Sequence, residues 1–372
     1  MKKVLFVATI NGHIIGCHLP YLKWFKEQGY EVHVASRGTE KIDYCDKHFN
    51  LPFERFPLKI NNVKAYKGLK KIISDNNYDI IHCHTPVGGV LTRLAAKKER
   101  KKGTKVLYTA HGFHFYKGAP LLNWLIYYPI EKIMARYTDC LITIVNEDYE
   151  FAKKHLKAKE IRHINGIGMN TERFSKKITE EQKNELRKEL EIKKEDIVFT
   201  YVAELNKNKN QIILIRMIEE LKKKNKNVKL LLVGDGVYMK KYKKEVEKRK
   251  LQNNIMFLGK RKDVPEILFI TNVYVASSKR EGLPLNIMEA MYMRLPIVAT
   301  NNRGHRELID NNLNGYLIEN EVSGFVKKIK EIIKNKKLIK EFGKNSYKKS
   351  LNYIDKKVIK EMEEIYIQGM KG

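Results

Sequence analysis

The segment Glu281–Glu289 carries the residues whose types and spacing most readily do chemistry. It follows Val273–Ala276, an apolar run that predicts a buried strand. Pro284 suits the first position of a helix, where its missing N–H would be unpaired anyway. We therefore expect the amides of Leu285 and the two residues after it to be free to face an anion. Gly282 lets the backbone approach a ligand closely. A phosphate-bearing sugar fits this layout, although two glutamates at this spacing are also common in an ordinary helix.

These residues need a scaffold, and the first half of the chain predicts one of alternating strands and helices. Short apolar runs rich in β-branched residues indicate buried parallel strands, and the amphipathic stretches between them indicate crossover helices. The predicted strands are Lys3–Thr9, Glu31–Ser36, Ile80–His84, Lys105–Ala110 and Cys140–Val145. The predicted helices are Leu19–Gln28, Tyr66–Asn76, Gly89–Lys101 and Ala119–Tyr137.

The same alternation restarts in the second half. The predicted strands there are Ile197–Val202, Val228–Val233, Ile255–Leu258, Val273–Ala276, Pro296–Ala299 and Tyr316–Ile318. The predicted helices are Gln211–Asn225, Val237–Lys250, Val264–Ile270 and Pro284–Met293, and the Lys-rich stretch Lys327–Lys340 is expected to be a solvated helix face. The pattern predicts an α/β protein of two Rossmann-like, doubly wound domains facing a cleft where a ligand binds.

The pattern breaks near Ile164–Lys194, where a Gly-rich stretch gives way to a charged helix. We therefore place an N-terminal Rossmann-like domain at 1–170 and a C-terminal one at 171–350. The remainder, 351–372, is expected to form a helix that packs back on the N-terminal domain.

Composition limits the function classes. The chain has 372 residues and a formal charge of +30 spread along its length. That charge favours anionic partners, or it reflects a Lys-rich composition on solvated helix faces; both readings stay open. Four scattered cysteines form no CxxC pair, which argues against a metal site and a disulfide framework. No run approaches the roughly 18 apolar residues of a membrane span. We expect a cytoplasmic protein, soluble or peripheral on the inner face of the cytoplasmic membrane.

Several segments resemble family-four retaining glycosyltransferases of GT-B fold. They are SSKREGLPLNIMEAMYMRLPIVAT (Ser277–Thr300), the first loop and helix Thr9–Ala35, YTAHGFHFY (Tyr108–Tyr116), HINGIGMNTERF (His163–Phe174), VAELNKNKNQ (Val202–Gln211), LLVGDG (Leu231–Gly236) and FLGKRKDVPEIL (Phe257–Leu268). IIHCHTPVGGVLTRLAA (Ile80–Ala96) and APLLNWLIYYPIEK (Ala119–Lys132) resemble transferases of bacterial capsular and exopolysaccharide pathways.

The resemblance implies a role for each matched residue. Glu281 would bind the hydroxyls of the donor sugar, helped by the backbone of Gly282 and Leu283, with Pro284 and Leu285 opening the helix. Glu289 would hold the ribose hydroxyls. Lys209 would neutralise the diphosphate, although it could instead be an ordinary solvated lysine.

Other roles follow from the same resemblance. The loop Gly259-Lys260-Arg261 would lie against the base, chiefly through its backbone. The turn Gly234–Gly236 would supply donors to the phosphates. His111 would reach the sugar from the N-terminal domain, unless His114 takes that role or His111 is only a turn histidine.

Two departures from the family pattern stand out. Glu204 occupies a position where an arginine is usual, and a carboxylate there would repel the diphosphate. Either its side chain points away, or Lys207 and Lys209 supply the charge together, with Arg280 a further candidate. The first loop offers Gly12 and Gly16 separately instead of as a pair, which weakens an amide cradle there.

The chemistry implied is departure of a nucleoside diphosphate from the anomeric carbon, which needs fixed donors at the phosphate. No Asp-x-Asp motif occurs in the sequence, so we expect no metal and no cofactor, the nucleotide sugar being a substrate. The resemblance implies that the leaving phosphate takes the acceptor proton and that configuration is retained.

The acceptor is expected to bind the N-terminal domain. Lys59–Lys71 and Arg93–Lys105 are basic beside apolar positions, and Ala119–Ile130 is strongly apolar and aromatic. These segments could lie on an anionic membrane surface, or Ala119–Ile130 could be a core helix. A polyprenyl-diphosphate-linked sugar acceptor suits the first alternative.

We expect the protein to transfer a sugar, a hexose or N-acetylhexosamine, from a nucleotide-sugar donor to a lipid-linked saccharide in cell-surface polysaccharide biosynthesis. A UDP-linked donor is favoured. A UDP-sugar 2-epimerase shares this fold and is the alternative. A nucleic-acid-binding module is disfavoured, because no zinc finger, RNP-like aromatic pair or single recognition helix occurs. A catalytically inactive binding subunit is a third reading, given Glu204.

Overall fold

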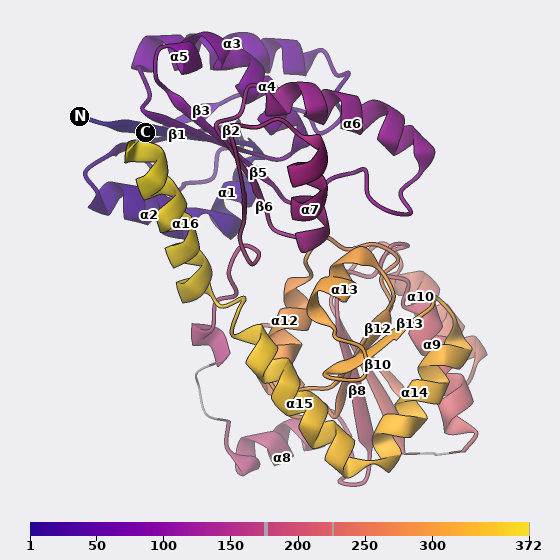
Figure 1. Cartoon of the computed structure of the whole chain (residues 1–372). Coiled ribbons are helices and arrows are strands. Elements are labelled where there is room, and N and C mark those ends of the chain that lie inside the picture. The colour runs from indigo at the N-terminus through magenta and orange to yellow at the C-terminus, as the bar shows by residue number, and fades with distance from the viewer. Residues whose placement is uncertain (175–177, 225–226, 372) are drawn as a thin grey trace. The chain divides into compact units, whose positions relative to one another are not determined.

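The chain forms two units, each with its own parallel sheet. The computed structural model describes residues 1–174, 178–224 and 227–371 (Figure 1). One unit comprises Met1–Gly168 together with the segment from Lys356 onward, and the other comprises Met169–Asp355. No helix among the described residues is long and apolar enough to cross a membrane.

The first unit has a seven-stranded sheet in the order β3-β2-β1-β4-β5-β6-β7, in which every neighbouring pair is parallel. The strands are β1 (Lys3–Ile10), β2 (Glu31–Arg37), β3 (Lys47–Asn50), β4 (Ile80–His84), β5 (Lys105–Ala110), β6 (Cys140–Thr143) and β7 (Glu160–His163). The strand order reverses direction between β1 and β4. In such sheets, ligands bind at the carboxyl ends of the strands beside this reversal.

Helices follow the strands of the first unit as the alternating pattern predicts. They are α1 (Asn11–Cys17), α2 (Leu19–Glu27), α3 (Asn61–Asn76), α4 (Pro86–Ala95), α5 (Lys97–Lys101), α6 (Leu121–Ala135), α7 (Asn146–His155) and the C-terminal α16 (Asp355–Lys371). Helix α16 packs in this unit through Tyr366, whose hydroxyl is 2.7 Å from Nδ1 of His82.

The second unit has a six-stranded parallel sheet in the order β10-β9-β8-β11-β12-β13. Its strands are β8 (Ile197–Val202), β9 (Val228–Val233), β10 (Ile255–Gly259), β11 (Val273–Ala276), β12 (Ile297–Thr300) and β13 (Gly315–Ile318). Its helices are η1 (Glu172–Phe174), α8 (Glu180–Glu189), α9 (Ile212–Lys222), α10 (Met239–Lys248), α11 (Val264–Phe269), α12 (Leu285–Tyr292), α13 (Arg303–Leu308), α14 (Val322–Lys334) and α15 (Lys336–Ser350). The reversal of strand order here lies between β8 and β11.

The predicted fold class, two doubly wound α/β domains, is confirmed. Two short strands escaped prediction, β3 (KHFN) and β7 (EIRH). They form the two edges of the seven-stranded sheet, and none of their residues is fully buried. Exposed edge strands carry charged side chains and therefore lack the apolar run by which a buried strand is recognised.

The observed helix boundaries differ more from the predicted ones than the strand boundaries do. The single helix predicted at Gly89–Lys101 is two helices, α4 and α5. The stretch Lys327–Lys340 also spans two helices, because Asn335 ends α14 and caps α15 with its side-chain oxygen. That stretch is not only a solvated face, since Ile329 and Ile332 are fully buried. Two predicted ends lie outside the described residues. They are Asn225, the end of the predicted helix Gln211–Asn225, and Gly372, the end of the predicted C-terminal segment 351–372.

Candidate functional site

The loops that follow β8 and β11 lie together at the carboxyl edge of the second sheet, because these two strands are neighbours. The amide nitrogen of Lys279 donates to the carbonyl of Asn208 at 2.8 Å, and the Asn208 side chain donates to the carbonyl of Arg280 at 2.9 Å. The hydroxyl of Ser277 donates to the carbonyl of Lys209 at 2.8 Å. This network fixes the two loops against each other.

The network brings Lys209 and Glu281 together. Nζ of Lys209 lies 2.5 Å from Oε1 of Glu281, and the two side chains are 21% and 14% exposed. A partly shielded ion pair of this kind offers a cation and an acceptor side by side. Lys209 is therefore not an ordinary solvated lysine, and its role at a diphosphate stays a prediction.

The loop that follows β9 lies against the loop that follows β8. Gly234 has φ +136°, and a Cβ on it would lie 2.2 Å from the carbonyl oxygen of Ala203. A Cβ on Gly236 would lie 2.4 Å from the carbonyl oxygen of Leu205. The amide of Gly234 donates to the carbonyl of Gly259 at 2.7 Å. Glycine is thus required at these two positions for the loop after β9 to approach the loop after β8.

The start of α12 differs from the expectation by one residue. Pro284 is the residue before the helix, with φ −77° and ψ 111°, and no side chain caps the helix start. The expectation of three free amides is wrong at Ile287, whose amide donates to the carbonyl of Pro284 and to Oδ1 of Asn286. The Asn286 side chain in turn donates to the carbonyl of Val202 at 2.6 Å, which ties α12 to β8.

Glu289 lies one turn into α12, as predicted, and is buried. Burial raises the pKa of its carboxyl, and the opposing attraction comes from Arg173, whose Nη1 lies 3.4 Å away. A buried carboxylate that is paired with a single cation has further lone pairs that can accept hydrogen bonds from ligand hydroxyls.

The remaining predicted donor-side residues are exposed or engaged in local ion pairs. Glu204 is exposed, and its carboxylate accepts from Nδ2 of Asn206 at 3.0 Å. Lys260 is exposed. The Arg261 guanidinium forms a 2.6 Å ion pair with Asp263, and the contact of this loop's backbone with a base stays a prediction.

One histidine beside the site was not singled out from the sequence. His305, in α13, is 1% exposed, and its Nδ1 lies 2.6 Å from the carbonyl oxygen of Thr300. Burial lowers its pKa to about 4, and the charges of Glu281 and Lys209 act on it as well. Gly304 makes this approach possible, since a Cβ there would lie 2.3 Å from the carbonyl of Gly282. The position of His305 shortly after the predicted strand Pro296–Ala299 was the sequence signal that could have indicated it.

In the first unit, the glycines expected in a loop lie in a helix. Helix α1 begins directly after β1 and includes both Gly12 and Gly16. No atom lies within 4 Å of a Cβ built on Gly16, and that on Gly12 meets only the Ile10 side chain at 4.0 Å. The expected first loop with separate glycines is therefore wrong, because the chain turns into the helix without a linker.

His111 lies at the end of β5 within a group of histidines from four separate segments. Its Nε2 is 3.1 Å from Nε2 of His13 in α1. Nearby, His18 and His84 are buried and stack with ring centroids 3.7 Å apart. Burial lowers the pKa of His13 to about 4 and the pKa values of the other three below their ordinary range. Sequence reasoning considered His111 alone, because nothing in the spacing joins residues so far apart.

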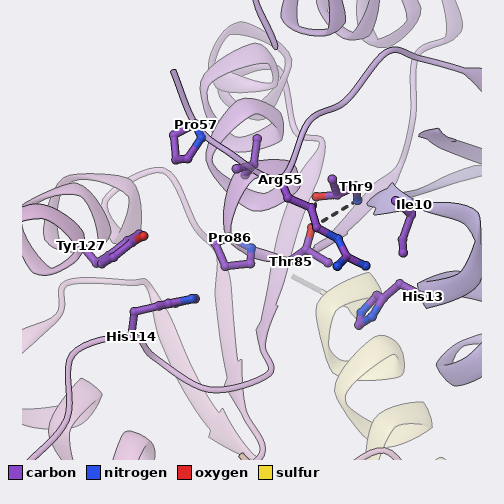
Figure 2. A pocket seen from close by; sticks show the side chains of 10 residues that line it. Thr9, Ile10, His13, Arg55, Pro57, Thr85, Pro86, His114 and Tyr127 are labelled. Atoms are coloured by element: carbon purple, nitrogen blue, oxygen red, sulfur yellow. Dashed lines mark hydrogen bonds between the residues drawn. The ribbon is translucent and has the colours of Figure 1, made fainter. Parts of the chain in front are cut away.

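A cavity of about 310 Å³ lies beside His13 in the first unit. It is lined by Thr9, Ile10, His13, Arg55, Pro57, Thr85, Pro86, Val87, His114 and Tyr127. Figure 2 shows Arg55 reaching in toward Thr9 and His13, with His114 and Tyr127 on the other side. His114 thus lines a cavity, whereas its competitor His111 belongs to the histidine group.

The helix α6 that borders this cavity has two apolar faces. Trp124 and Tyr128 pack on the core of the unit. Leu121, Leu122 and Leu125 are exposed to between 64% and 73%. Helix α6 therefore packs on the core with one face, as the core-helix alternative predicts, and exposes leucines on another face. The membrane alternative stays a prediction. Arg93 also departs from the predicted basic surface, since it is fully buried and paired with Glu131 at 2.5 Å.

Comparisons with known proteins agree with this architecture. The family described as "Glycosyl transferases group 1" matches residues 182–349, and "Glycosyl transferase 4-like" matches residues 3–145. EpsD of Bacillus subtilis (strain 168), named as a glycosyltransferase, is 44% identical over 98% of this chain and 96% of its own. An Escherichia coli protein named UDP-Gal:alpha-D-GlcNAc-diphosphoundecaprenol alpha-1,3-galactosyltransferase is 30% identical over 82% of this chain and 79% of its own.

Solved structures share the fold. Anabaena HepE, in complex with UDP and glucose, has a TM-score of 0.79 at 19% identity, covering 99% of this chain and 100% of that one. A Rickettsia africae glycosyltransferase has a TM-score of 0.81 at 20% identity, covering 100% and 99%. The chain therefore belongs to the family-four glycosyltransferases of GT-B fold and is a sugar-transferring enzyme.

Proposed function

We propose that this enzyme transfers a sugar from a UDP-sugar to a polyprenyl-diphosphate-linked saccharide, with retention, in cell-surface polysaccharide biosynthesis. The observation that carries the donor half is the Lys209–Glu281 pair, held at the strand reversal of the second unit. The E. coli relative supports a UDP-linked donor and a lipid diphosphate acceptor, because its name states both.

The donor chemistry rests on charge. Breaking the anomeric C–O bond leaves negative charge on the departing diphosphate, and a fixed cation stabilises it where the charge develops. Lys209 supplies that cation. The first amides of α12, at Leu285 and Asn286, add donors at a positive helix end. The diphosphate is thus neutralised by the chain's own groups, and no metal is invoked there.

Two carboxylates then divide the hydroxyl groups of the donor. Glu281 accepts from the sugar hydroxyls beside Lys209, and Glu289 accepts from the ribose hydroxyls deeper in the unit. Glu204 is given no part in binding the donor, because its exposed carboxylate accepts a hydrogen bond from Asn206. The carboxylate keeps its charge, which solvent screens at an exposed position.

The acceptor half rests on the cavity of the first unit. Arg55 provides a cation, and Thr9, Thr85 and His114 provide hydrogen-bonding groups, which suits a diphosphate or a sugar. Two exposed apolar segments border the same cavity: the loop that carries Pro57 and Leu58, which is 86% exposed, and helix α6, which carries Tyr127. Apolar residues beside cationic ones bind at anionic membrane surfaces.

The membrane part is tested with sedimentation of anionic vesicles. Wild-type protein should sediment with them at low salt and be released at high salt. Leu122→Glu/Leu125→Glu should sediment less. Leu313→Glu, an equally apolar position that is half exposed in the second unit, is the matched control. Equal sedimentation of all three proteins would contradict the assignment of this surface.

Transfer itself is tested by incubating each UDP-sugar with a synthetic polyprenyl-diphosphate-linked sugar and following the lipid product. We expect one UDP-sugar to yield product and Glu281→Gln to yield far less. A 2-epimer of the donor formed without any acceptor would replace this proposal by the epimerase alternative.

A further inference from the structure

We propose that His13, His18, His84 and His111 form a zinc-binding site in the first unit. The four histidines come from α1, the start of α2 and the ends of β4 and β5, all at the carboxyl edge of one sheet. One ring nitrogen from each can be chosen so that all four lie within 4.8 Å of one another. Of the four, only His111 has an expected role at the nucleotide sugar.

The spacing fits a tetrahedral zinc ion. With zinc–nitrogen bonds of about 2.0–2.1 Å, two ligating nitrogens lie about 3.3 Å apart and their ring centroids about 5 Å apart. The His13 and His111 nitrogens are 3.1 Å apart, and their ring centroids 4.5 Å. The rings of His18 and His84 lie between 5.1 and 5.9 Å from those two.

Only one pair departs from this spacing. His18 and His84 stack at 3.7 Å, so their rings must separate by about 1.5 Å for both to bind one ion. His13 and His111 with either member of the stacked pair already form a three-histidine set. Zinc in proteins is bound by three such ligands as readily as by four.

The chemical state of the histidines also fits. Both ring nitrogens of His18 and both of His84 are buried without a hydrogen-bond partner among the described residues. A buried polar atom without a partner is costly, and a metal ion would engage one nitrogen on each ring.

The ligand set selects the metal class. All the donors are imidazole nitrogens, which suit zinc and its neighbours, whereas magnesium and calcium prefer oxygen. His13 also lines the 310 Å³ cavity, which gives an ion a route to the site. His82 is excluded from the set, because its two ring nitrogens already form hydrogen bonds with the hydroxyls of Tyr366 and Thr109.

The test is zinc binding by chelator-stripped protein, measured in competition with a chromophoric chelator, together with the visible spectrum of added Co²⁺. We expect one ion per chain and the intense absorption of tetrahedral cobalt. His13→Gln and His84→Gln should each weaken binding at least about tenfold, the smallest loss usual for changes around a metal site. His155→Gln, an exposed histidine in α7, should match wild type.

Circular dichroism checks that each variant is folded. If His84→Gln does not fold, His13→Gln decides, because its side chain is only half-buried. Binding equal to wild type in a folded His13→Gln variant would overturn the proposal. Absence of stoichiometric zinc binding by wild type, or only the weak spectrum of octahedral cobalt, would overturn it as well.

One consequence depends on the proposed function. If His111 contributes to transfer, bound zinc should inhibit transfer while leaving UDP binding unchanged, because the donor residues of the second unit are not ligands. UDP binding measured in the same samples separates failure of the zinc site from failure of the donor assignment.

Discussion

Removal of the Lys209 charge is the perturbation that most sharply separates a positioned cation from the diffuse positive charge of the chain. Lys209→Met keeps most of the length of the side chain and deletes its charge. It also leaves Glu281 without its ion-pair partner, 2.5 Å away in the native protein. Both effects weaken binding of a dianionic ligand, since a cation is lost and a nearby negative charge is exposed.

The size of the effect can be worked from the geometry. A cation about 4 Å from a phosphate oxygen gains roughly 4 kcal/mol at an effective dielectric constant of 20. Desolvation, and competition from Glu281 for the same ammonium group, reduce the net to about 2–3 kcal/mol, in the range of charge-assisted hydrogen bonds. Because each 1.4 kcal/mol is a factor of ten, UDP-sugar affinity should fall roughly 30- to 100-fold.

The assay is calorimetric titration with UDP and a UDP-sugar at fixed salt, paired with kcat/KM for transfer. Lys207→Met is the matched control, because that lysine is exposed and only two residues away. It should lose less than about threefold, as expected for a charge largely screened by solvent. Equal losses in the two variants would refute the reasoning, since the chain's general charge would then account for binding.

Four further substitutions test the framework. Arg93→Met should lower the free energy of unfolding by about 3–5 kcal/mol in urea titration, because the Glu131 carboxylate would stay buried without its partner; a loss under about 1 kcal/mol would contradict this. Gly234→Ala should lower the free energy of unfolding by about 1–3 kcal/mol and weaken UDP binding, because its Cβ would lie 2.2 Å from a backbone oxygen at φ +136°. Gly369→Ala, at an open position of α16, should instead raise the free energy of unfolding by about 0.5–1 kcal/mol. Burial raises the folded-state pKa of Glu289, so wild-type stability should fall as pH rises from the ordinary range near 4.3 through that raised pKa. Glu289→Gln should therefore unfold at higher urea than wild type at pH 7, and its advantage should vanish on acidification; an advantage independent of pH would contradict the assignment.

The sequence predicted the parallel sheets because their buried strands are continuous apolar runs. Ile197–Val202 and Val228–Val233 were placed to the residue. The edge strands were missed because half-exposed strands carry polar side chains, which do not differ from those of loops. Helix breaks were missed where a cap decides them, as Asn335 does between α14 and α15.

The candidate site was predictable to the level of segments and not of contacts. Glu281 and Lys209 were named from motifs, but their ion pair depends on β8 and β11 being neighbours, which is a property of topology. The hydrogen bond from the amide of Ile287 to the Asn286 side chain depends on a side-chain rotamer, as does the hydrogen bond from Asn206 to Glu204. The histidine group joins residues nearly a hundred positions apart, and no local pattern in the sequence signals it.

The most direct test of the central claim is thermal unfolding of wild type and Glu281→Ala in the presence of UDP or UDP-sugars. A ligand at about 100 times its Kd stabilises the folded state by about 2.7 kcal/mol. Wild type should be stabilised by UDP, and more by one UDP-sugar. Glu281→Ala should keep the UDP shift and lose the increment from the sugar. The donor-site account would be contradicted if no nucleotide sugar shifted wild type, or if Glu281→Ala retained the full increment.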